Sequence, residues 1–293
     1  MRTPHVERRT KNVDPPRVQY TASMPVDFSA EVISNTQLSS DYNVLALAAR
    51  PIAEAAAPGQ FVMVKLASGD DPLLRRPFSV FEVLRDSRGG ITGFSLLNKR
   101  IGPSTALIYF ARPGQRVACL GPLGRPFTVV DPPVEAWMVA GGVGLAPFAA
   151  LAESLRARGT ATTLFYGARS AGELFYLDTF RTLGVTIELT TEDGTLGERG
   201  RIIAPLERRL AGCNRERAVM IYACGPEGML AATARTAMKY ARPCQVSVER
   251  IMGCGMGGCY SCVVPMRNDD GGFHHVRSCL AGPVLAGDQI IWE

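Results

Sequence analysis

The 293-residue sequence has little histidine, and it shows no internal repeat. Its three histidines are His5 and the adjacent pair His274 and His275. A Ser-His-Asp or Cys-His hydrolase is hard to assemble from so few imidazoles. This scarcity favours chemistry carried by bound cofactors, which the protein holds and tunes.

Signals for export or membrane insertion are also missing. The first residues lack the apolar core of a secretory signal. The longest uncharged run, residues 136–152, contains Gly141, Gly142, Gly144 and Pro147, which is typical of a strand, a turn and a buried helix. We therefore expect no membrane span. Eight cysteines without an export signal indicate a reducing, cytoplasmic location.

Composition is that of a globular protein with a sizeable core, since 46% of residues are hydrophobic and 20% are charged. The length allows two domains and a small module. Part of the net charge of +5 lies in residues 1–26, which we predict to be a mobile basic tail. No aromatic residue is interleaved with these charges, so we expect no nucleic-acid partner.

Two different sequence patterns follow the tail, and together they predict an α+β multidomain fold. Residues 27–131 carry short apolar strands separated by Gly and Pro, which predicts an antiparallel β-barrel. Residues 132–242 alternate strands with helices, which predicts a doubly wound parallel α/β domain with ligands at the carboxyl ends of its strands. The expected barrel strands are residues 30–34, 43–49, 60–66, 78–84, 93–98 and 116–120. The expected α/β strands are residues 136–140, 162–166, 185–190 and 218–224, and the expected helices are residues 146–158, 173–183, 202–210 and 229–240.

The last segment, residues 243–293, is predicted to be a small iron–sulfur module. Cys254, Cys259, Cys262 and Cys279 have the spacing C-x4-C-x2-C-x16-C, and their first three match the plant-type [2Fe–2S] ligand run. Glycines among them allow tight bends around a cluster. A structural zinc site and unliganded thiols remain the alternatives. A Rieske centre is not expected, because no histidine replaces a cysteine of the set.

Motifs in the first two domains suggest phosphate and ring binding. Arg76-Pro77-Phe78-Ser79 offers a cation for a phosphate and an aromatic ring for a planar ligand, although an ordinary Arg-Pro turn would have the same sequence. Residues 97–105 offer a turn with hydroxyls. Gly141, Gly142 and Gly144 follow a strand and open a helix, where a dinucleotide pyrophosphate could bind. Cys224-Gly225-Pro226 follows the last α/β strand, and a structural turn is the alternative there.

In this order and spacing, these motifs resemble the ferredoxin–NADP reductase superfamily. With the cysteine module, the chain looks like the electron-transfer subunit of NAD-dependent dihydroorotate dehydrogenase over residues 28–293. The resemblance implies FAD in the barrel, NAD(H) in the α/β domain and a [2Fe–2S] cluster at the C-terminus. It also implies a role in dihydroorotate oxidation during pyrimidine biosynthesis, with electrons exchanged in pairs with NAD(H) and singly through the cluster.

The resemblance further implies individual roles. Arg76 would contact the FAD pyrophosphate, Phe78 would pack on the isoalloxazine, and Ser79 would lie near its N5. Cys224 would sit near the nicotinamide, where hydride passes. The remaining implied contacts are Pro77, Leu97, Asn98, Lys99, Ser104 and Thr105 for the flavin, and Gly141, Gly142, Gly144, Gly225 and Pro226 for the nucleotide. Ser104 stands where the family usually has glycine.

The acidic residues that follow one predicted strand favour NAD over NADP as the bound nucleotide. Thr190-Thr191-Glu192-Asp193-Gly194 follows a predicted strand, and its carboxylates would repel a 2′-phosphate and could accept from a ribose hydroxyl. From this segment we predict Asp193 as the ribose contact. Arg169 and Ser170 argue weakly for NADP.

The expected partner is a catalytic oxidoreductase subunit, such as an FMN-containing dihydroorotate dehydrogenase, in a hetero-oligomer. The same architecture resembles reductase subunits of hydrogenases, sulfite reductases and transhydrogenases. A stand-alone reductase that feeds an oxygenase or a ferredoxin is a second possibility. A non-catalytic module with structural zinc is a third.

Overall fold

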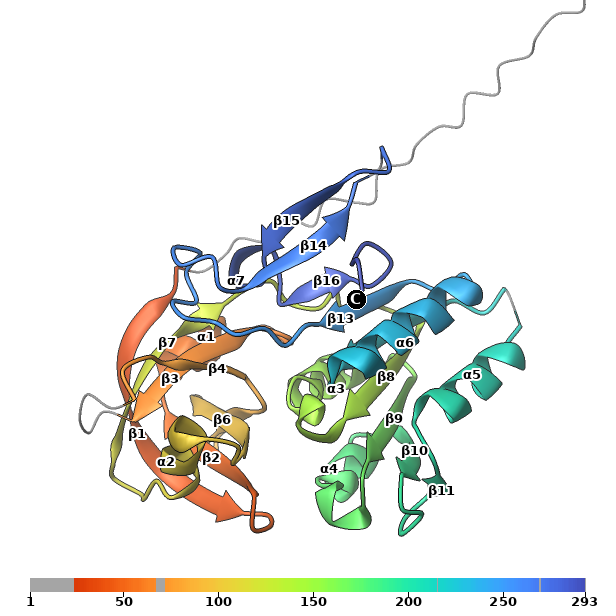
Figure 1. Ribbon diagram of the computed structural model, residues 1–293. Helices are drawn as coiled ribbons and strands as arrows, with labels where there is room; N and C mark the ends of the chain where they lie inside the picture. Colours follow the sequence, from red (N-terminus) through yellow and green to blue (C-terminus); the bar gives the residue numbers. More distant parts are fainter. Residues whose placement is uncertain (1–23, 67–71, 215, 269, 293) are drawn as a thin grey trace, which may run out of the picture.

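The computed structural model describes residues 24–66, 72–214, 216–268 and 270–292. Most of the predicted basic tail, residues 1–23, lies outside the described residues. The described chain forms two large sheets and one small one (Figure 1).

The first sheet has seven strands in the order β4-β3-β7-β1-β2-β6-β5, and all its neighbouring strands are antiparallel. It curves into a half-barrel, in agreement with the predicted antiparallel barrel class (Figure 1). Two short helices, which the sequence analysis did not anticipate, accompany it: α1 (Arg50–Ala55) and α2 (Pro103–Tyr109). The strands are β1 (Val26–Gln37), β2 (Tyr42–Ala48), β3 (Phe61–Leu66), β4 (Arg76–Ser79), β5 (Val83–Arg85), β6 (Ile91–Lys99) and β7 (Arg116–Leu123).

One predicted strand is in fact two. Residues 78–84 divide into β4, which pairs with β3, and β5, which pairs with β6. Between them Val80 N donates to Gln60 O and Phe81 N donates to Ser95 O, so the chain changes partner strands at this point. Burial of the Phe81 side chain stabilises the chain at the point where it passes from one partner strand to the other.

The second sheet has the order β11-β10-β9-β8-β12-β13-β16. It is parallel apart from β16, as predicted for a doubly wound domain. Its strands are β8 (Glu135–Gly141), β9 (Thr162–Ala168), β10 (Thr186–Thr191), β11 (Glu198–Arg199), β12 (Val219–Cys224), β13 (Cys244–Ser247) and β16 (Val284–Ala286). Its helices are η1 (Gly142–Leu145), α3 (Phe148–Ala157), η2 (Ala171–Glu173), α4 (Leu177–Thr182), α5 (Ile203–Ala211) and α6 (Glu227–Lys239).

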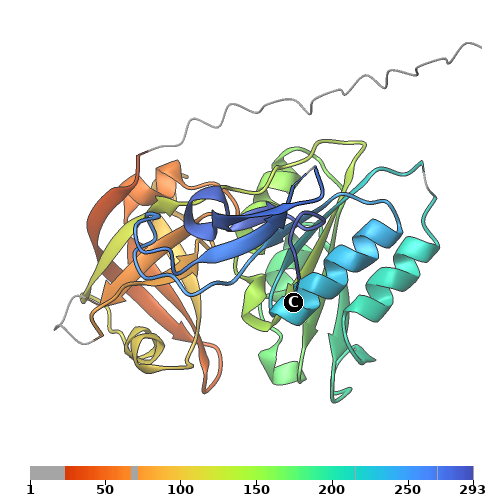
Figure 2. The ribbon, with the colours of Figure 1, turned by 45° about the horizontal axis from the view of Figure 1, so that its top comes forward.

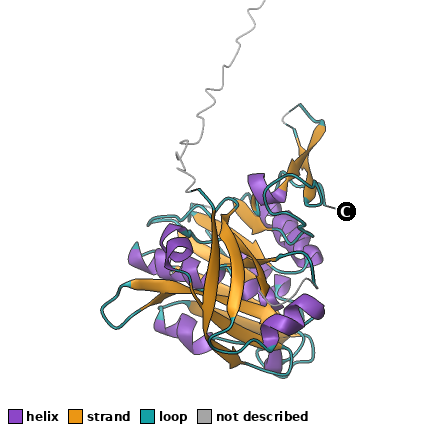
Figure 3. Cartoon of the chain, turned by 90° about the vertical axis from the view of Figure 1, so that its left-hand side faces the viewer, coloured by secondary structure: helices purple, strands orange, loops and turns teal. Residues whose placement is uncertain are grey.

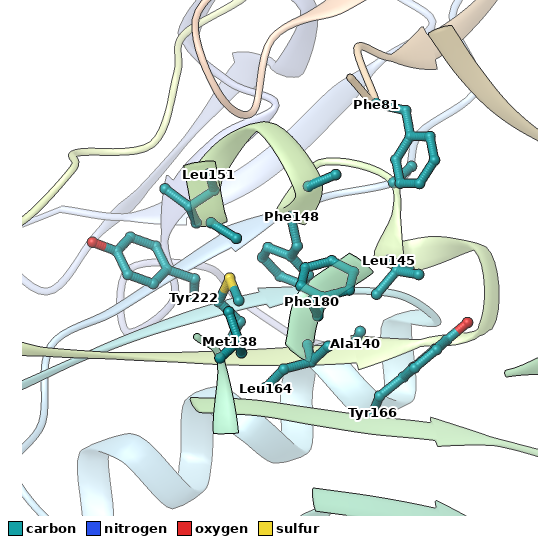
Figure 4. Packing of buried hydrophobic residues seen from close by; sticks show 14 of the residues in the cluster. Phe81, Met138, Ala140, Leu145, Phe148, Leu151, Leu164, Tyr166, Phe180 and Tyr222 are labelled. Carbon is teal, nitrogen blue, oxygen red and sulfur yellow. The ribbon is translucent and has the colours of Figure 1, made fainter. Parts of the chain in front are cut away.

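Helices cover both faces of this sheet. Phe148 of α3 and Phe180 of α4 pack on one face (Figure 4). Leu206 of α5 and Leu230 of α6 pack on the other. The α3 face also receives Phe81 from the barrel side, and Ala150 N donates to Phe81 O. A continuous apolar core therefore joins the half-barrel to the α/β domain.

The C-terminal segment is woven into both domains. β13 and β16 extend the parallel sheet beyond residue 242, where we placed the domain boundary, and that boundary stays a prediction. Between them lie the hairpin of β14 (Val263–Arg267) and β15 (Phe273–Arg277), and α7 (Ser278–Ala281). Figure 2 shows this segment lying across the two domains, and Figure 3 shows the hairpin standing out from the body.

Within the described ranges, no helix is both long and apolar enough to cross a membrane.

The turn after β8 depends on a glycine. A Cβ placed on Gly144 would overlap the carbonyl group of Cys224 at the end of β12. We expect Gly144→Ala to lower the free energy of unfolding by about 1–3 kcal/mol, because the backbone of β12 has to move. Calorimetric unfolding would measure this change. The matched control is Gly228→Ala in α6, where a Cβ meets nothing within 4 Å. Equal melting temperatures for the two variants would contradict the expectation.

Candidate functional site

The first three cluster-type cysteines lie on a glycine-rich loop between β13 and β14. Gly255 and Gly257 have φ angles of +72° and +82°, which L side chains rarely adopt. A Cβ on Gly255 would stand 2.6 Å from Met63 Cγ, and one on Gly257 would stand 2.5 Å from Leu280 Cδ1. The loop therefore has its shape because glycine occupies these positions.

The four thiols lie close together. Cys254 Sγ accepts N–H groups from Met256 at 3.4 Å and Gly258 at 3.3 Å. Hydrogen bonds from Ser261, and then from Cys254, lower the pKa of Cys259 to about 6. Burial first, then Cys262 and less strongly Cys254, raise the pKa of Cys279 to about 12. Cys254 therefore neighbours both Cys259 and Cys279.

Four cysteines are the ligand set of a two-iron cluster. Each iron of a [2Fe–2S] centre takes two protein ligands. The donor set and the N–H···S bonds to Cys254 fit such a cluster.

A second candidate site lies on the half-barrel. Arg76 and Phe78 of β4 and Ser104 of α2 line one small cavity of about 10 Å³. Among the residues that the structure describes, the Arg76 guanidinium donates to the carbonyls of Leu74 and Arg75, at 3.4 and 3.3 Å, while the neighbouring Arg75 is paired with Asp27 at 2.8 Å. No carboxylate of these described residues pairs with Arg76, which favours its use for a phosphate group.

Of the other predicted flavin residues, two lie on strand β4 and one closes a turn. Pro77 and Ser79 lie on β4 opposite Met63 and Phe61 of β3. Thr105 Oγ1 accepts from the N–H groups of Ile101 and Gly102, both at 2.9 Å, so it closes the turn before α2.

Residues 97–99 differ in burial: the first two are buried, and the third lines a pocket. Asn98 is fully buried, and its Nδ2 donates to Asn43 Oδ1 at 2.7 Å and to Thr105 O at 3.0 Å. Leu97 is buried as well. Lys99 differs, because it lies over the Tyr42 ring and lines the larger pocket described next.

A pocket of about 620 Å³ opens at the carboxyl ends of β8, β9, β10 and β12. This is where open α/β sheets bind ligands. Lys99 and Ile101 of the barrel side also line it. The predicted nucleotide residues that line it are Gly141, Gly142, Gly225 and Pro226. Gly144 packs beneath them against Cys224.

Thr190 gives this pocket an unsatisfied polar group. Its Oγ1 is buried without a hydrogen-bond partner among the described residues, and Thr190 lines the pocket. Buried hydroxyls are normally hydrogen-bonded, so a polar ligand would complete this one. The pocket therefore fits a dinucleotide in position, size and chemistry.

Cys224 stands at the end of β12 with its thiol neutral. It lies opposite Ser247 of β13, and burial, followed by the charge of Glu249, raises its pKa to about 12. Glu249 itself lines the pocket, five residues before Cys254. The chain after β13 therefore runs directly from the pocket to the cysteine loop.

Asp193, the predicted ribose contact, lies outside the pocket lining, and its role stays a prediction. Its Oδ1 accepts from Thr195 N at 3.0 Å and from Thr195 Oγ1 at 2.7 Å. Glu192, the other carboxylate of the predicted segment, lines the pocket. The sequence analysis assigned no nucleotide contact to Arg201, because the sequence does not show which side chains beyond a strand end face a ligand.

Two family descriptions match the chain. "Iron-sulfur cluster binding domain of dihydroorotate dehydrogenase B" matches residues 249–291, and "Oxidoreductase NAD-binding domain" matches residues 138–235. Among solved structures, one titled for the NADH-dependent reduced ferredoxin–NADP oxidoreductase is similar, with a TM-score of 0.76, 25% identity and 90% of each chain covered. These matches confirm the predicted fold class and the ferredoxin–NADP reductase-like architecture.

Curated relatives agree with these matches. A protein of Desulforamulus reducens is 33% identical, covering 91% of this chain and 98% of its own length. One of Geobacillus kaustophilus is 35% identical, covering 84% and 91%. Both are named dihydroorotate dehydrogenase B (NAD(+)), electron transfer subunit. This chain belongs to that family of electron transfer subunits.

Proposed function

We propose that this chain transfers electrons between NAD(H) and a catalytic partner subunit that oxidises dihydroorotate. Membership of the electron transfer subunit family, with its iron–sulfur and NAD-binding regions, supports FAD, a [2Fe–2S] cluster and NAD(H) as its cofactors. One observation carries the proposal: strand β3 pairs with β4, the predicted flavin strand, and also packs against the cysteine loop. Candidate flavin and cluster sites therefore adjoin a single strand.

The protein's part is binding and orientation. When bound, FAD supplies hydride exchange with NAD(H) and single-electron exchange with the cluster. We assign Arg76 to the FAD pyrophosphate and Phe78 to the isoalloxazine face, with Ser79 near the reactive edge of the ring. The neutral Cys224 thiol places no negative charge beside a departing hydride.

A surface for the partner surrounds the cysteine loop. Large apolar side chains are exposed on the loop, on the adjoining hairpin and on α7, and exposed apolar side chains in one region favour a protein interface there. They are Ile251, Met256, Tyr260, Val263, Phe273 and Leu280. We place the catalytic subunit there, in a cytoplasmic hetero-oligomer.

The first test is a visible spectrum of the anaerobically purified chain, with iron, zinc and flavin quantified before and after NADH. Flavin and cluster bands that both bleach with NADH support the proposal. Full dihydroorotate turnover by the isolated chain would exclude a subunit role, and zinc in place of iron would exclude electron transfer through a cluster.

Cluster ligation predicts a loss of iron in Cys279→Ser, because the buried fourth thiolate is replaced by a weaker ligand. Iron analysis and the electron paramagnetic resonance of the reduced protein would measure it. Cys213→Ser is the matched control, since Cys213 lies outside the loop, and it is expected to retain iron. Full iron in both variants would contradict the assignment.

Flavin binding should depend on Arg76 and much less on its neighbour. Loss of a charged hydrogen bond costs about 1.5–3 kcal/mol, so Arg76→Ala should weaken FAD binding by about tenfold or more. Arg75→Ala removes an equal charge whose partner is Asp27, and it should retain FAD. Fluorescence titration of the deflavinated variants measures both constants. Equal weakening in the two variants would count against Arg76 as the phosphate contact.

Because the pKa of Cys224 is raised, we expect this thiol to cause no pH dependence in the rate of flavin reduction by NADH. A thiol with a pKa of about 12 stays protonated through pH 9, so it should add no alkaline limb to the rate of flavin reduction by NADH. Stopped-flow rates from pH 6 to pH 9 for the native chain and Cys224→Ala would show this. A limb with a pKa near 8.5 that disappears in Cys224→Ala would show that the thiol titrates.

A further inference from the structure

A serine hydroxyl lies against the most exposed of the four cluster-type cysteines. Ser261 Oγ stands 3.1 Å from Cys259 Sγ, and it accepts from Gly253 N at 3.0 Å. A Cβ on Gly253 would come within 3.2 Å of Cys259 Sγ, so glycine lets the backbone approach this pair closely. The hydroxyl therefore joins the start of the cysteine loop to its second cysteine.

The direction of the Ser261–Cys259 hydrogen bond follows from the protons that the two groups carry. A metal binds cysteine as the thiolate, which has no proton and can only accept. A serine hydroxyl has one proton and two acceptor lone pairs. Gly253 N–H already occupies one lone pair of Ser261, so the hydroxyl proton is free to point at sulfur. When Cys259 is a ligand, Ser261 donates and Cys259 accepts.

Cys259 and Cys254 differ in the origin of these donors. Cys254 Sγ accepts from the backbone N–H groups of Met256 and Gly258, and almost any residue supplies a backbone N–H. The hydroxyl at Cys259 belongs to a side chain, so it depends on the identity of one residue. Ser261 is also exposed, so removal of its hydroxyl opens no cavity in the core. Position 261 can thus change the electrostatics at one ligand without a change of fold.

We infer that the Ser261 hydroxyl raises the reduction potential of the cluster held by this loop, through its hydrogen bond to Cys259. The inference rests on the proposed transfer of electrons through a [2Fe–2S] cluster. Reduction adds one electron to the centre, breaks no bond and leaves the proton on the Ser261 oxygen. A hydrogen bond strengthens as its acceptor becomes more negative, so this one stabilises the reduced state more than the oxidised state.

The raised potential favours the arrival of single electrons at the exposed side of the loop. Electrons from a partner would pass more readily to the cluster, and the cluster would release them less readily to the flavin. Ser261 acts through Cys259, so it is a positioning residue for the donor proton. Its replacement should change the equilibrium between the redox groups and leave the dinucleotide pocket unaffected.

The test compares Ser261→Ala and Ser261→Thr with the native chain, all loaded with iron and flavin. Anaerobic potentiometry, read by the electron paramagnetic resonance of the reduced cluster, measures the potential. Ser261→Ala is expected to lower the equilibrium constant for cluster reduction about tenfold, which is about 59 mV for a one-electron couple. Ser261→Thr keeps a hydroxyl donor and should keep the native potential. Calorimetry should give the native NAD⁺ affinity in both variants.

Three results would overturn the inference while the proposed function stands. They are equal potentials in all three iron-loaded proteins, an equal fall of the potential in Ser261→Ala and Ser261→Thr, and loss of iron from Ser261→Ala. The last would show that the hydroxyl closes the loop instead of setting the potential. A native chain that binds no iron would defeat the proposed function first, and the inference with it.

Discussion

Packing of the cysteine loop onto the half-barrel is the contact on which the rest of the arrangement depends. Met63 of β3 and Leu123 of β7 lie directly under Gly255, where no Cβ would fit. Met252, Cys262 and Cys279 complete this small apolar core. Because β3 also pairs with β4, the same contact sets the distance between the thiols and Arg76-Pro77-Phe78-Ser79. A change of loop position would move one candidate redox site relative to the other.

The second fixed point is the end of β13. The chain leaves the parallel sheet at Ser247, passes Glu249 at the dinucleotide pocket and reaches Cys254 five residues later. Five residues span at most about 18 Å, so the pocket and the cysteine loop cannot be far apart. β16 returns to pair with β13 and ties the far end of the segment to the same sheet. The iron–sulfur segment is thus held by both domains.

The local sequence was sufficient to predict the elements whose backbone conformation depends on neighbouring residues. The cysteine spacing and the turn at Gly141 and Gly142 require close backbone bends, and such requirements are visible in a single sequence. Pairings between distant segments were not visible: the change of strands at Phe81, and β13 and β16 in the parallel sheet, depend on long-range packing. Glu192 and Asp193 show the same limit at a site: in the bend after β10, Glu192 lines the pocket, whereas Asp193 accepts from Thr195.

Solvent exposure changes from the proposed nucleotide site to the flavin strand and then to the cysteine loop. The dinucleotide pocket opens at the carboxyl ends of the parallel strands, and the β4 residues are half-buried. The loop then reaches the surface again, where Met256 and Tyr260 are exposed beside the cysteines. An apolar core around Phe81 and Phe148 joins the domains. In dihydroorotate oxidation as proposed, single electrons arrive at an apolar surface that the partner covers, and hydride leaves to NAD⁺ at the pocket.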